Sequence, residues 1–339
     1  MDEMKIYVTR IIVPDAIERL QNEFEVEVWE EPTPPPKKLM IEKARECDGM
    51  MIESNDVMDS EVFAAAEKLK VVGTRAIGYD NIDINAATAK GIAIGNTPGI
   101  LHESCADFTM GLILSLARQV SRSNRKVIAG EWKIFDQTPY LGTDVYGKTL
   151  GLIGLGNIGQ EIVKLIKPHG MKIIAHDPYV SKDVADDMDV SLTDLGTLMS
   201  TSDFVCVCCP LNGETYGLIG ETEFSLMKPS AFFVNTARGP IVNQSALTDA
   251  LQRHRIRGAG IDVFDKEPVD SDDPLLKLDN VILSPHAIAM TDECYRDIGR
   301  TNCQRVIQVS RGEIPDDVVN KEVLDQEVLQ EKMSGYRNR

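Results

Sequence analysis

The chain has 339 residues, of which 43% are hydrophobic, and it carries a formal net charge of −17. This length suffices for two domains with substantial cores, whereas the acidic excess argues against a nucleic-acid partner or a membrane surface, which require basic patches. The N-terminus lacks the basic and apolar regions of a secretory signal, and no apolar run reaches the roughly 18 residues of a membrane span.

Seven cysteines are spread along the chain without a Cys-x-x-Cys pair. An odd number without such a pair predicts free structural thiols in the reducing cytoplasm, so we expect a cytoplasmic protein. No spacing of histidine, cysteine and carboxylate residues suggests a metal site.

Residues 5–95 alternate short apolar runs with helix-like segments, an order that predicts a mostly parallel sheet. We expect strands at 5–9, 25–29, 50–53, 70–74 and 92–96, with helices at 14–23, 37–46, 59–66 and 84–90.

A long apolar helix is expected at 103–117, followed by a second α/β unit from 148 to about 283. An amphipathic helix at 291–311 is expected to pack back on the first domain, and 316–339 is a charged stretch with a frayed end. The expected strands of the second unit are 149–154, 172–176, 204–210, 231–236, 258–263 and 281–285. Two such halves predict two doubly wound domains with a cleft between them, where ligands bind at the carboxyl ends of the strands.

The most informative motif is Gly-x-Gly-x-x-Gly at Gly154, Gly156 and Gly159, between a strand-like run and a helix expected at 160–167. These glycines allow a tight turn, the approach of a pyrophosphate and close packing of helix on strand, in that order. Asp177 follows the next strand, 18 residues after Gly159. Its carboxylate can accept both ribose hydroxyls and would repel a 2′-phosphate, which predicts NAD rather than NADP.

Three residues at the ends of predicted strands could carry chemistry: Arg238, Glu267 and His286. An Arg fork can bind a carboxylate, a His can act as general acid or base near neutral pH, and a Glu can stabilise its imidazolium form. Each also has an ordinary explanation, as a solvated charge or a structural His. Spacing alone does not show that the three converge.

The chain resembles the D-isomer-specific 2-hydroxyacid dehydrogenase family over nearly its whole length, in particular its glyoxylate and hydroxypyruvate reductases and D-3-phosphoglycerate dehydrogenases. We expect no counterpart of the regulatory domain of the longer phosphoglycerate dehydrogenases. The resemblance is carried by GYDNIDINAA at 78–87, NTPG at 96–99, KTLGLIGLGNIGQ at 148–160, HDPY at 176–179, KPSAFFVNTARGPIVN at 228–243, GAGIDVFDKEP at 258–268 and LDNVILSPH at 278–286.

The resemblance implies an α/β fold with a flavodoxin-like substrate domain, residues 1–101 plus 288–339, and a Rossmann NAD-binding domain, residues 102–287. It implies hydride transfer between NAD(H) and a small 2-hydroxy or 2-keto acid, in a homodimer formed through the nucleotide-binding domains. The aromatic segment 130–146 is the expected subunit-embracing arm; the alternative is an interdomain loop.

By the same resemblance, Arg238 binds the substrate carboxylate and carbonyl, His286 is the general acid and Glu267 orients it. Backbone N–H groups near Ile77 and Gly78 bind the carboxylate. The implied cofactor contacts are Gly154, Gly156, Asn157, Ile158, Gly159, Asp177, Pro210, Thr236, Ala237 and Asp262, the last through the nicotinamide carboxamide.

Two departures from the family pattern lie beside this site. Ile288 follows His286 where a smaller residue is common, and it is expected to reshape the wall beside the histidine. Cys208 replaces a His, which alters a hydrogen bond near the cofactor and not the reaction type.

The substrate pocket is expected to be polar, because Ser54, Asn55 and Arg75 lie at strand ends facing the predicted cleft. Arg75 either binds a second anionic group of the substrate or forms a salt bridge with an acidic neighbour. The competing functions are an NAD(H)-sensing corepressor-like binding protein with weak dehydrogenase activity and a relative of S-adenosylhomocysteine hydrolase.

Overall fold

The computed structural model describes residues 4–10, 13–313, 315 and 318–334. The chain forms two compact units, one from Met1–Leu101 with Thr291–Arg339 and the other from His102–Met290. The chain passes from the second unit back to the first after Met290, whose N–H donates to the carbonyl of Ala287 at 2.9 Å. Thr291 then caps the next helix. The frayed end expected at 335–339 lies outside the described residues.

The first unit is a five-stranded parallel sheet in the order β2-β1-β3-β4-β5, which is the flavodoxin-like order expected. Its core has one apolar cluster on each face of the sheet, built on alternate residues such as Ile6 and Tyr7 of β1. The strands are β1 Lys5–Val8, β2 Glu25–Val28, β3 Gly49–Ile52, β4 Val71–Thr74 and β5 Ala93–Gly95. The helices are α1 Pro14–Gln21, α2 Lys37–Glu46, α3 Ser60–Ala65, α4 Ile84–Ala89, α12 Asp292–Ser310 and α13 Glu327–Ser334, with the 3₁₀ turn Lys321–Asp325.

The second unit is a seven-stranded parallel sheet in the order β12-β11-β10-β9-β6-β7-β8. The chain starts in the middle at β6, runs outward to β8 and then returns to β9 on the other side, as in a Rossmann fold. The strands are β6 Thr149–Ile153, β7 Lys172–His176, β8 Ser191–Leu192, β9 Phe204–Val207, β10 Phe232–Asn235, β11 Gly258–Ile261 and β12 Val281–Leu283. Its helices are α5 His102–Ala117, α6 Val120–Ile128, α7 Asn157–Ile166, α8 Lys182–Asp187, α9 Leu195–Thr201, α10 Glu221–Leu226 and α11 Gln244–Gln252, and its 3₁₀ turns are 138–140, 167–169, 239–241 and 274–277.

The central strands read as continuous apolar runs because helices cover both faces of each sheet. All four residues of β9 and of β10 are buried. Side-chain caps set where several helices begin. The hydroxyl of Thr291 accepts the N–H of Cys294 at 3.0 Å, and Asp59 accepts the N–H groups of Glu61 and Val62 at 3.1 Å.

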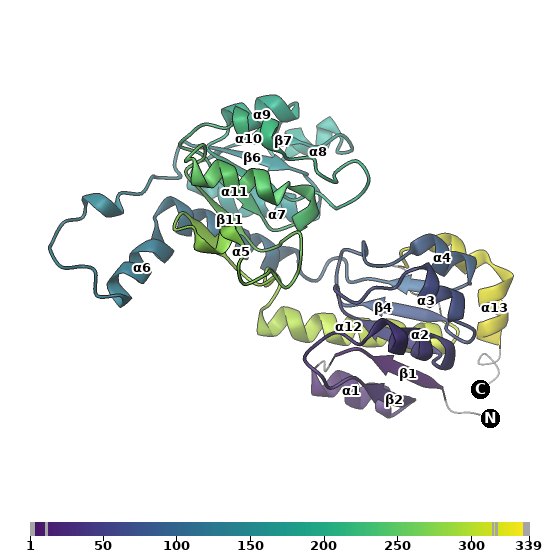
Figure 1. Cartoon of the computed structure of the whole chain (residues 1–339). Helices are drawn as coiled ribbons and strands as arrows, with labels where there is room; N and C mark the ends of the chain where they lie inside the picture. The colour runs from purple at the N-terminus through teal and green to yellow at the C-terminus, as the bar shows by residue number, and fades with distance from the viewer. Residues whose placement is uncertain (1–3, 11–12, 314, 316–317, 335–339) are drawn as a thin grey trace. The chain divides into compact units, whose positions relative to one another are not determined.

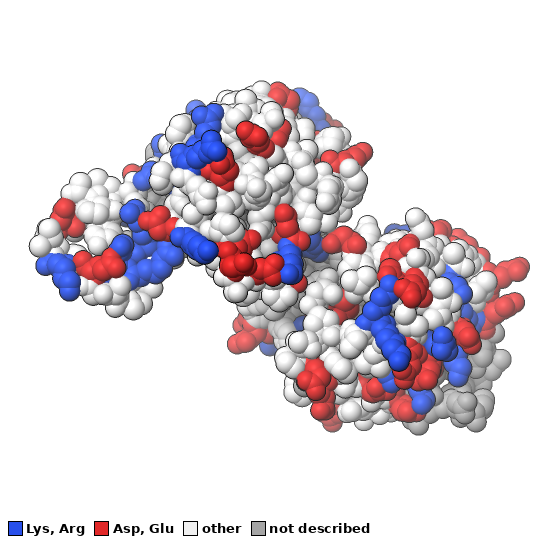
Figure 2. All heavy atoms as spheres, viewed as in Figure 1, with Lys and Arg blue, Asp and Glu red and all other residues white. Residues whose placement is uncertain are grey.

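Residues 120–146, which include the arm expected at 130–146, extend away from the rest of the second unit (Figure 1) and are called the arm below. The arm begins with α6, which the sequence did not predict and which has no buried residue. Its apolar side chains face solvent, with Ile128 78%, Ile134 73% and Phe135 81% exposed. Figure 2 shows uncharged surface on this lobe beside both basic and acidic groups. Such a surface is typical of a protein–protein contact.

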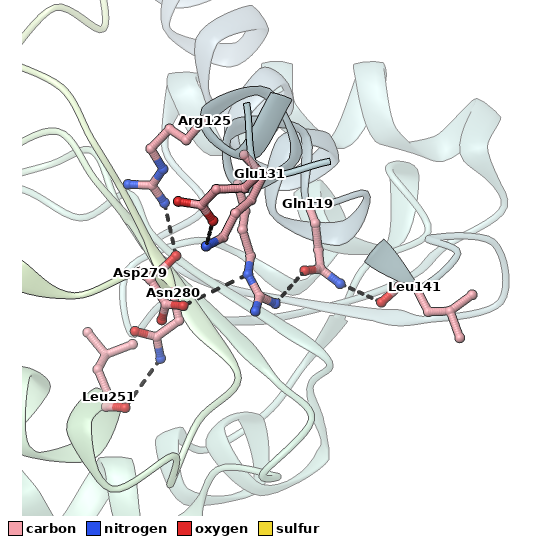
Figure 3. Close-up of polar contacts among 9 residues, drawn as sticks. Gln119, Arg125, Glu131, Leu141, Leu251, Asp279 and Asn280 are labelled. Atoms are coloured by element: carbon pink, nitrogen blue, oxygen red, sulfur yellow. Dashed lines mark hydrogen bonds and ion pairs between the residues drawn. The ribbon is translucent and has the colours of Figure 1, made fainter. Parts of the chain in front are cut away.

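The base of the arm is fastened to the unit by polar contacts (Figure 3). Arg125 donates to the carbonyl of Asp279 at 3.0 Å, and Gln119 donates to the carbonyl of Leu141. Arg257 donates to the same Leu141 carbonyl at 3.1 Å. These bonds hold both ends of the arm to the sheet.

Within the described residues no helix has both the length and the apolar character needed to cross a bilayer. The same residues contain no group of three or more His, Cys, Asp or Glu side chains placed to hold a metal ion. The seven cysteines are free thiols.

Candidate active site

Each glycine of the loop after β6 has a different physical reason for being glycine. Gly154 has φ +99°, and a Cβ there would lie 2.7 Å from the backbone nitrogen of Cys209. A Cβ on Gly159 would lie 2.7 Å from the carbonyl oxygen of Gly154, so only glycine lets α7 pack this close to the strand. A Cβ on Gly156 would meet no atom within 4 Å. The space beside Gly156 is therefore open, as a loop that admits a phosphate requires.

The N-terminus of α7 presents donors to this space. α7 begins at Asn157, inside the glycine motif and not at 160 as expected, and its N-cap Gly156 has no side chain to cap it. Among the described residues, the N–H groups of Gly156, Asn157 and Ile158 have no protein acceptor. Three free donors at the positive end of a helix fit the pyrophosphate of a dinucleotide.

Asp177 follows β7 and is held by its own loop. Its Oδ2 accepts the N–H of Leu155 at 2.7 Å, and its Oδ1 accepts those of Tyr179 and Val180 at 2.8 and 3.1 Å. The carboxylate thus links the glycine loop to the end of β7, where a ribose would lie in a Rossmann fold.

The remaining expected cofactor contacts follow β9 and β10. The carbonyl of Pro210 accepts the hydroxyl of Thr215 at 2.7 Å, and Thr236 lies 3.2 Å from the hydroxyl of Thr109 on α5. The N–H of Ala237 donates to the side chain of Asn235 at 3.1 Å. Cys208, which departs from the family pattern, precedes the Cys209 backbone that closes over Gly154, and burial raises the pKa of its thiol.

Glu267 and His286 form the pair that the sequence could not establish. Nδ1 of His286 lies 2.8 Å from Oε2 of Glu267, and each side chain is 28% exposed. The other oxygen of Glu267 accepts the N–H of Phe264 at 2.9 Å. Burial raises the pKa of Glu267, but the hydrogen bond and charge of His286, the Phe264 N–H and the charge of Arg238 together hold that pKa below its usual value. In the described chain, Nε2 of His286 has no hydrogen-bond partner.

Arg238 reaches the same place because two strand-end loops touch. A Cβ on Gly239 would lie 2.0 Å from the backbone of Phe264, so a glycine is required where the loop after β10 crosses the loop after β11. This crossing brings Arg238 close enough to Glu267 for its charge to act on that carboxylate. The Arg238 side chain donates to the carbonyl of Ala237 at 2.9 Å.

Asp262 has a function that the sequence reasoning did not identify. Its side chain is fully buried and accepts the Ser284 hydroxyl at 2.6 Å and the N–H groups of Ala287 and Ile288 at 2.8 and 3.0 Å. Its carbonyl accepts the N–H of His286 at 2.8 Å. His286 has φ +52°, in the left-handed region that non-glycine residues rarely occupy. Asp262 therefore holds the histidine loop in a conformation it would not adopt alone, and the only available sign was the spacing of Asp262 from Ser284 across neighbouring strand ends.

Ile288 is only 8% exposed, and its N–H is bound to Asp262. Its side chain is buried. The expected effect of Ile288 on the wall beside His286 stays a prediction.

The expected substrate residues lie in the first unit, after β3 and β4. Ser54 is half-buried and Asn55 is exposed. The N–H groups of Ile77 and Gly78 have no protein acceptor among the residues that the structure describes. Arg75 is instead enclosed, with its side chain 6% exposed and its guanidinium bound to Glu53.

A hollow of about 440 Å³ lies at the opposite edge of the seven-stranded sheet from the glycine loop. It is lined by the first residues of β10 and β12, Phe232 and Val281, and by Arg122, Arg125 and Arg257. Ligands of doubly wound sheets bind at the carboxyl ends of the strands, so this hollow is not the catalytic site.

Comparisons with known proteins bear on these residues. A family model described as "D-isomer specific 2-hydroxyacid dehydrogenase, NAD binding domain" matches residues 110–287. The chain is 42% identical over 321 residues to a glyoxylate reductase from Korarchaeum cryptofilum, covering 94% of this chain and 97% of that protein. It is 42% identical over 327 residues to a D-3-phosphoglycerate dehydrogenase from Methanocaldococcus jannaschii, covering 96% of this chain and 61% of that protein. The crystal structure of the TT0316 protein from Thermus thermophilus matches with a TM-score of 0.87 and 32% identity, over 93% of this chain and 100% of that one.

Proposed function

The chain belongs to the D-isomer specific 2-hydroxyacid dehydrogenase family, and from this premise we propose that it transfers a hydride between NAD(H) and C2 of a small D-2-hydroxy acid or 2-keto acid. The observation that carries the proposal is the 2.8 Å contact between His286 and Glu267, with Arg238 beside them. That arrangement supplies a proton donor, a carboxylate that orients it and a cation for the substrate.

In the direction of reduction, His286 donates the proton on Nε2 to the oxygen that develops negative charge at C2. Nδ1 stays bound to Glu267, which fixes the ring and stabilises its protonated form. In oxidation the neutral Nε2 accepts the hydroxyl proton. NAD(H), when bound, supplies or accepts the hydride.

Arg238 binds the substrate carboxylate and polarises the carbonyl, because a guanidinium fork matches two oxygens at once. In the first unit, the N–H groups of Ile77 and Gly78 have no protein acceptor among the described residues, and two successive donors of this kind can bind a carboxylate. The donors at Gly156, Asn157 and Ile158 hold the pyrophosphate of the cofactor, and Asp177 the ribose.

Oxidation of NADH, followed by its absorbance with a panel of 2-keto acids, tests this function. His286→Gln keeps the size of the side chain without the proton, so kcat should fall by about 10²–10⁴-fold with NADH binding intact. Arg238→Ala should raise KM as well as lower kcat. Near-normal turnover by His286→Gln would contradict the assignment of the general acid. Tight NADH binding with almost no turnover on any keto acid would instead favour the corepressor-like alternative.

For the substrate, we propose a short 2-keto acid, either glyoxylate itself or one with a polar group, such as hydroxypyruvate or a sugar acid. Ser54 and Asn55 provide polar groups after β3, the strand that pairs with β4, and burying them against an apolar tail would leave them unpaired. The relatives that are named glyoxylate reductases support the same substrate class. The ratio of kcat/KM for hydroxypyruvate and for 2-ketoisocaproate decides the point, and a preference for 2-ketoisocaproate would refute it.

We also propose that the chain works as a cytoplasmic homodimer that buries the arm. Ile128, Ile134 and Phe135 are exposed in one copy although their arm is anchored at both ends, which supports a preformed surface for a second copy. Light scattering at micromolar concentration should give twice the monomer mass. A monomer mass that does not change with concentration would refute the dimer.

A further inference from the structure

Arg75 is the first residue after β4, and its side chain is buried, although its Nε has no hydrogen-bond partner among the described residues. Its N–H donates to the carbonyl of Ile52 at 3.0 Å, which ties the end of β4 to the end of β3. Its side chain binds Glu53 and is only 6% exposed. The guanidinium carbon lies 4.5 Å from the centre of the Tyr295 ring on α12, a cation–π distance. Arg75 thus connects β3, β4 and α12.

The ion pair with Glu53 balances the charge of Arg75 within the first unit. Glu53 is also largely buried, with its side chain 22% exposed, and its carbonyl accepts the amide of Asn81 at 3.2 Å. A substrate anion that bound Arg75 would have to displace this carboxylate and leave it buried without its cation. Removing one partner of a buried pair is strongly unfavourable.

The loop that follows Arg75 is fixed through its carbonyl groups and open at its N–H groups. The carbonyl of Ala76 accepts the N–H of Thr97 at 3.1 Å, and that of Ile77 accepts the side chain of Asn96 at 2.8 Å. The N–H groups of Ile77 and Gly78 have no acceptor in the described parts of the chain. Asn96 and Thr97 therefore hold the carbonyl side of the loop, while Arg75 fixes the point where the loop leaves the sheet.

We propose that Arg75 is a positioning residue: held by Glu53 and Tyr295, it sets the orientation of the Ile77 and Gly78 N–H groups that receive the substrate carboxylate, and it does not touch the substrate. The proposal rests on the function proposed above. It decides between the two roles that the sequence left open for Arg75. Because every 2-keto acid has the carboxylate, loss of Arg75 should affect all such substrates alike.

The test compares Arg75→Met, Glu53→Gln and the double variant with glyoxylate, which has no group beyond its aldehyde carbon, and with oxaloacetate, which has a second anion. Arg75→Met should raise KM for both by the same factor, about tenfold, with kcat within about threefold and the Kd for NADH unchanged. Glu53→Gln should act in the same direction, and the double variant should be no worse than the poorer single variant, because one contact is lost in each case.

Arg75→Lys keeps the charge but loses the planar guanidinium beside Tyr295, so its KM should lie between those of the wild type and Arg75→Met. If Arg75 served stability alone, its replacement would lower the Tm without raising KM equally for both substrates. Arg296→Met is the matched control, since Arg296 lies on α12 beside Tyr295 and pairs with the exposed Asp297 at 3.2 Å. It should leave KM unchanged. The proposal is overturned if Arg75→Met affects oxaloacetate alone, if Glu53→Gln lowers KM for oxaloacetate, or if both variants leave KM unchanged. A wild-type enzyme inactive with every 2-keto acid would instead refute the proposed function.

Discussion

Replacing Asp262 with Asn should disable the histidine loop while leaving the fold intact. The carboxylate accepts three hydrogen bonds from the loop, from the Ser284 hydroxyl and from the N–H groups of Ala287 and Ile288. An Asn side chain offers one oxygen and one NH₂ group in the same space. With its oxygen toward Ser284 and Ala287, its NH₂ group faces the N–H of Ile288, donor against donor.

The magnitude follows from these contacts. A hydrogen bond to a charged group contributes about 1.5–3 kcal/mol and a neutral one about 0.5–1.5 kcal/mol. The two surviving bonds would each lose about 1 kcal/mol, and the bond to Ile288 would be lost altogether, for a sum of about 4 kcal/mol. The left-handed backbone of His286 already costs about 1–2 kcal/mol. The loop should therefore leave its native conformation most of the time, and kcat/KM should fall by about 10²–10³-fold.

Steady-state kinetics with saturating NADH, together with a fluorescence titration of NADH, provide the assay. Ser284→Ala is the matched control, because it removes one donor and leaves the carboxylate its two backbone N–H partners. We expect it to cost no more than about tenfold. The reasoning fails if Asp262→Asn retains kcat/KM within about threefold of the wild type. It also fails if only the Kd for NADH changes, since Asp262 would then act on the nicotinamide alone.

Three further outcomes are expected. Gly156→Ala should keep the wild-type Tm but weaken NADH binding by at least about tenfold, because its Cβ enters the open space expected for the phosphate. Gly159→Ala should lower both the Tm and the affinity for NADH, because its Cβ meets a carbonyl oxygen at 2.7 Å. Equal Tm values for the two variants would contradict this. Asp177→Ala should raise the ratio of kcat/KM for NADPH to that for NADH by about 30–150-fold, and the absolute rate with NADH should also fall, because three loop N–H groups lose their acceptor; an unchanged ratio would exclude Asp177 from cofactor choice. The pKa of Glu267 lies below its usual value, so its stabilisation of the pair with His286 is present above the ordinary carboxyl range and is lost as pH falls through the lowered pKa. Glu267→Gln removes this stabilisation at every pH, so kcat for reduction should fall by about 10²-fold and should begin to decline at a lower pH on the alkaline side. A pH–rate profile superimposable on that of the wild type would refute this.

Local pattern was sufficient for most strands, for the first four helices, α5, α7 and α12, and for the glycine loop. Buried parallel strands are short apolar runs, and these helices have their own periodicity, but the order of the strands in each sheet depends on tertiary packing. The roles expected for Gly154, Gly156 and Gly159 depend on backbone geometry within one turn, which the motif itself determines.

The sequence was least informative where a residue acts across the fold. Asp262 is 22 residues from Ser284, and only the positions of these two residues at the ends of neighbouring strands indicate that the carboxylate could bind the histidine loop. Arg75 and Tyr295 are brought together only because α12 packs on β4, a tertiary contact with no local sign. The two-residue β8 at the sheet edge is too short to show a periodic pattern, and α6 was missed although it is amphipathic. The short helices α8, α9, α10, α11 and α13 were not predicted either.

The division of the chain after Leu101 and Met290 places the residues proposed for the redox step and those proposed for the substrate in different units. Arg238, Glu267 and His286 lie in the same continuous segment as the glycine loop. The free N–H groups of Ile77 and Gly78, with Ser54 and Asn55, lie in the other unit. Recombination that exchanged this other unit between relatives could change which acid is accepted while the proton relay stayed untouched. Chimaeras joined at these two positions are therefore a natural starting point for engineering substrate choice.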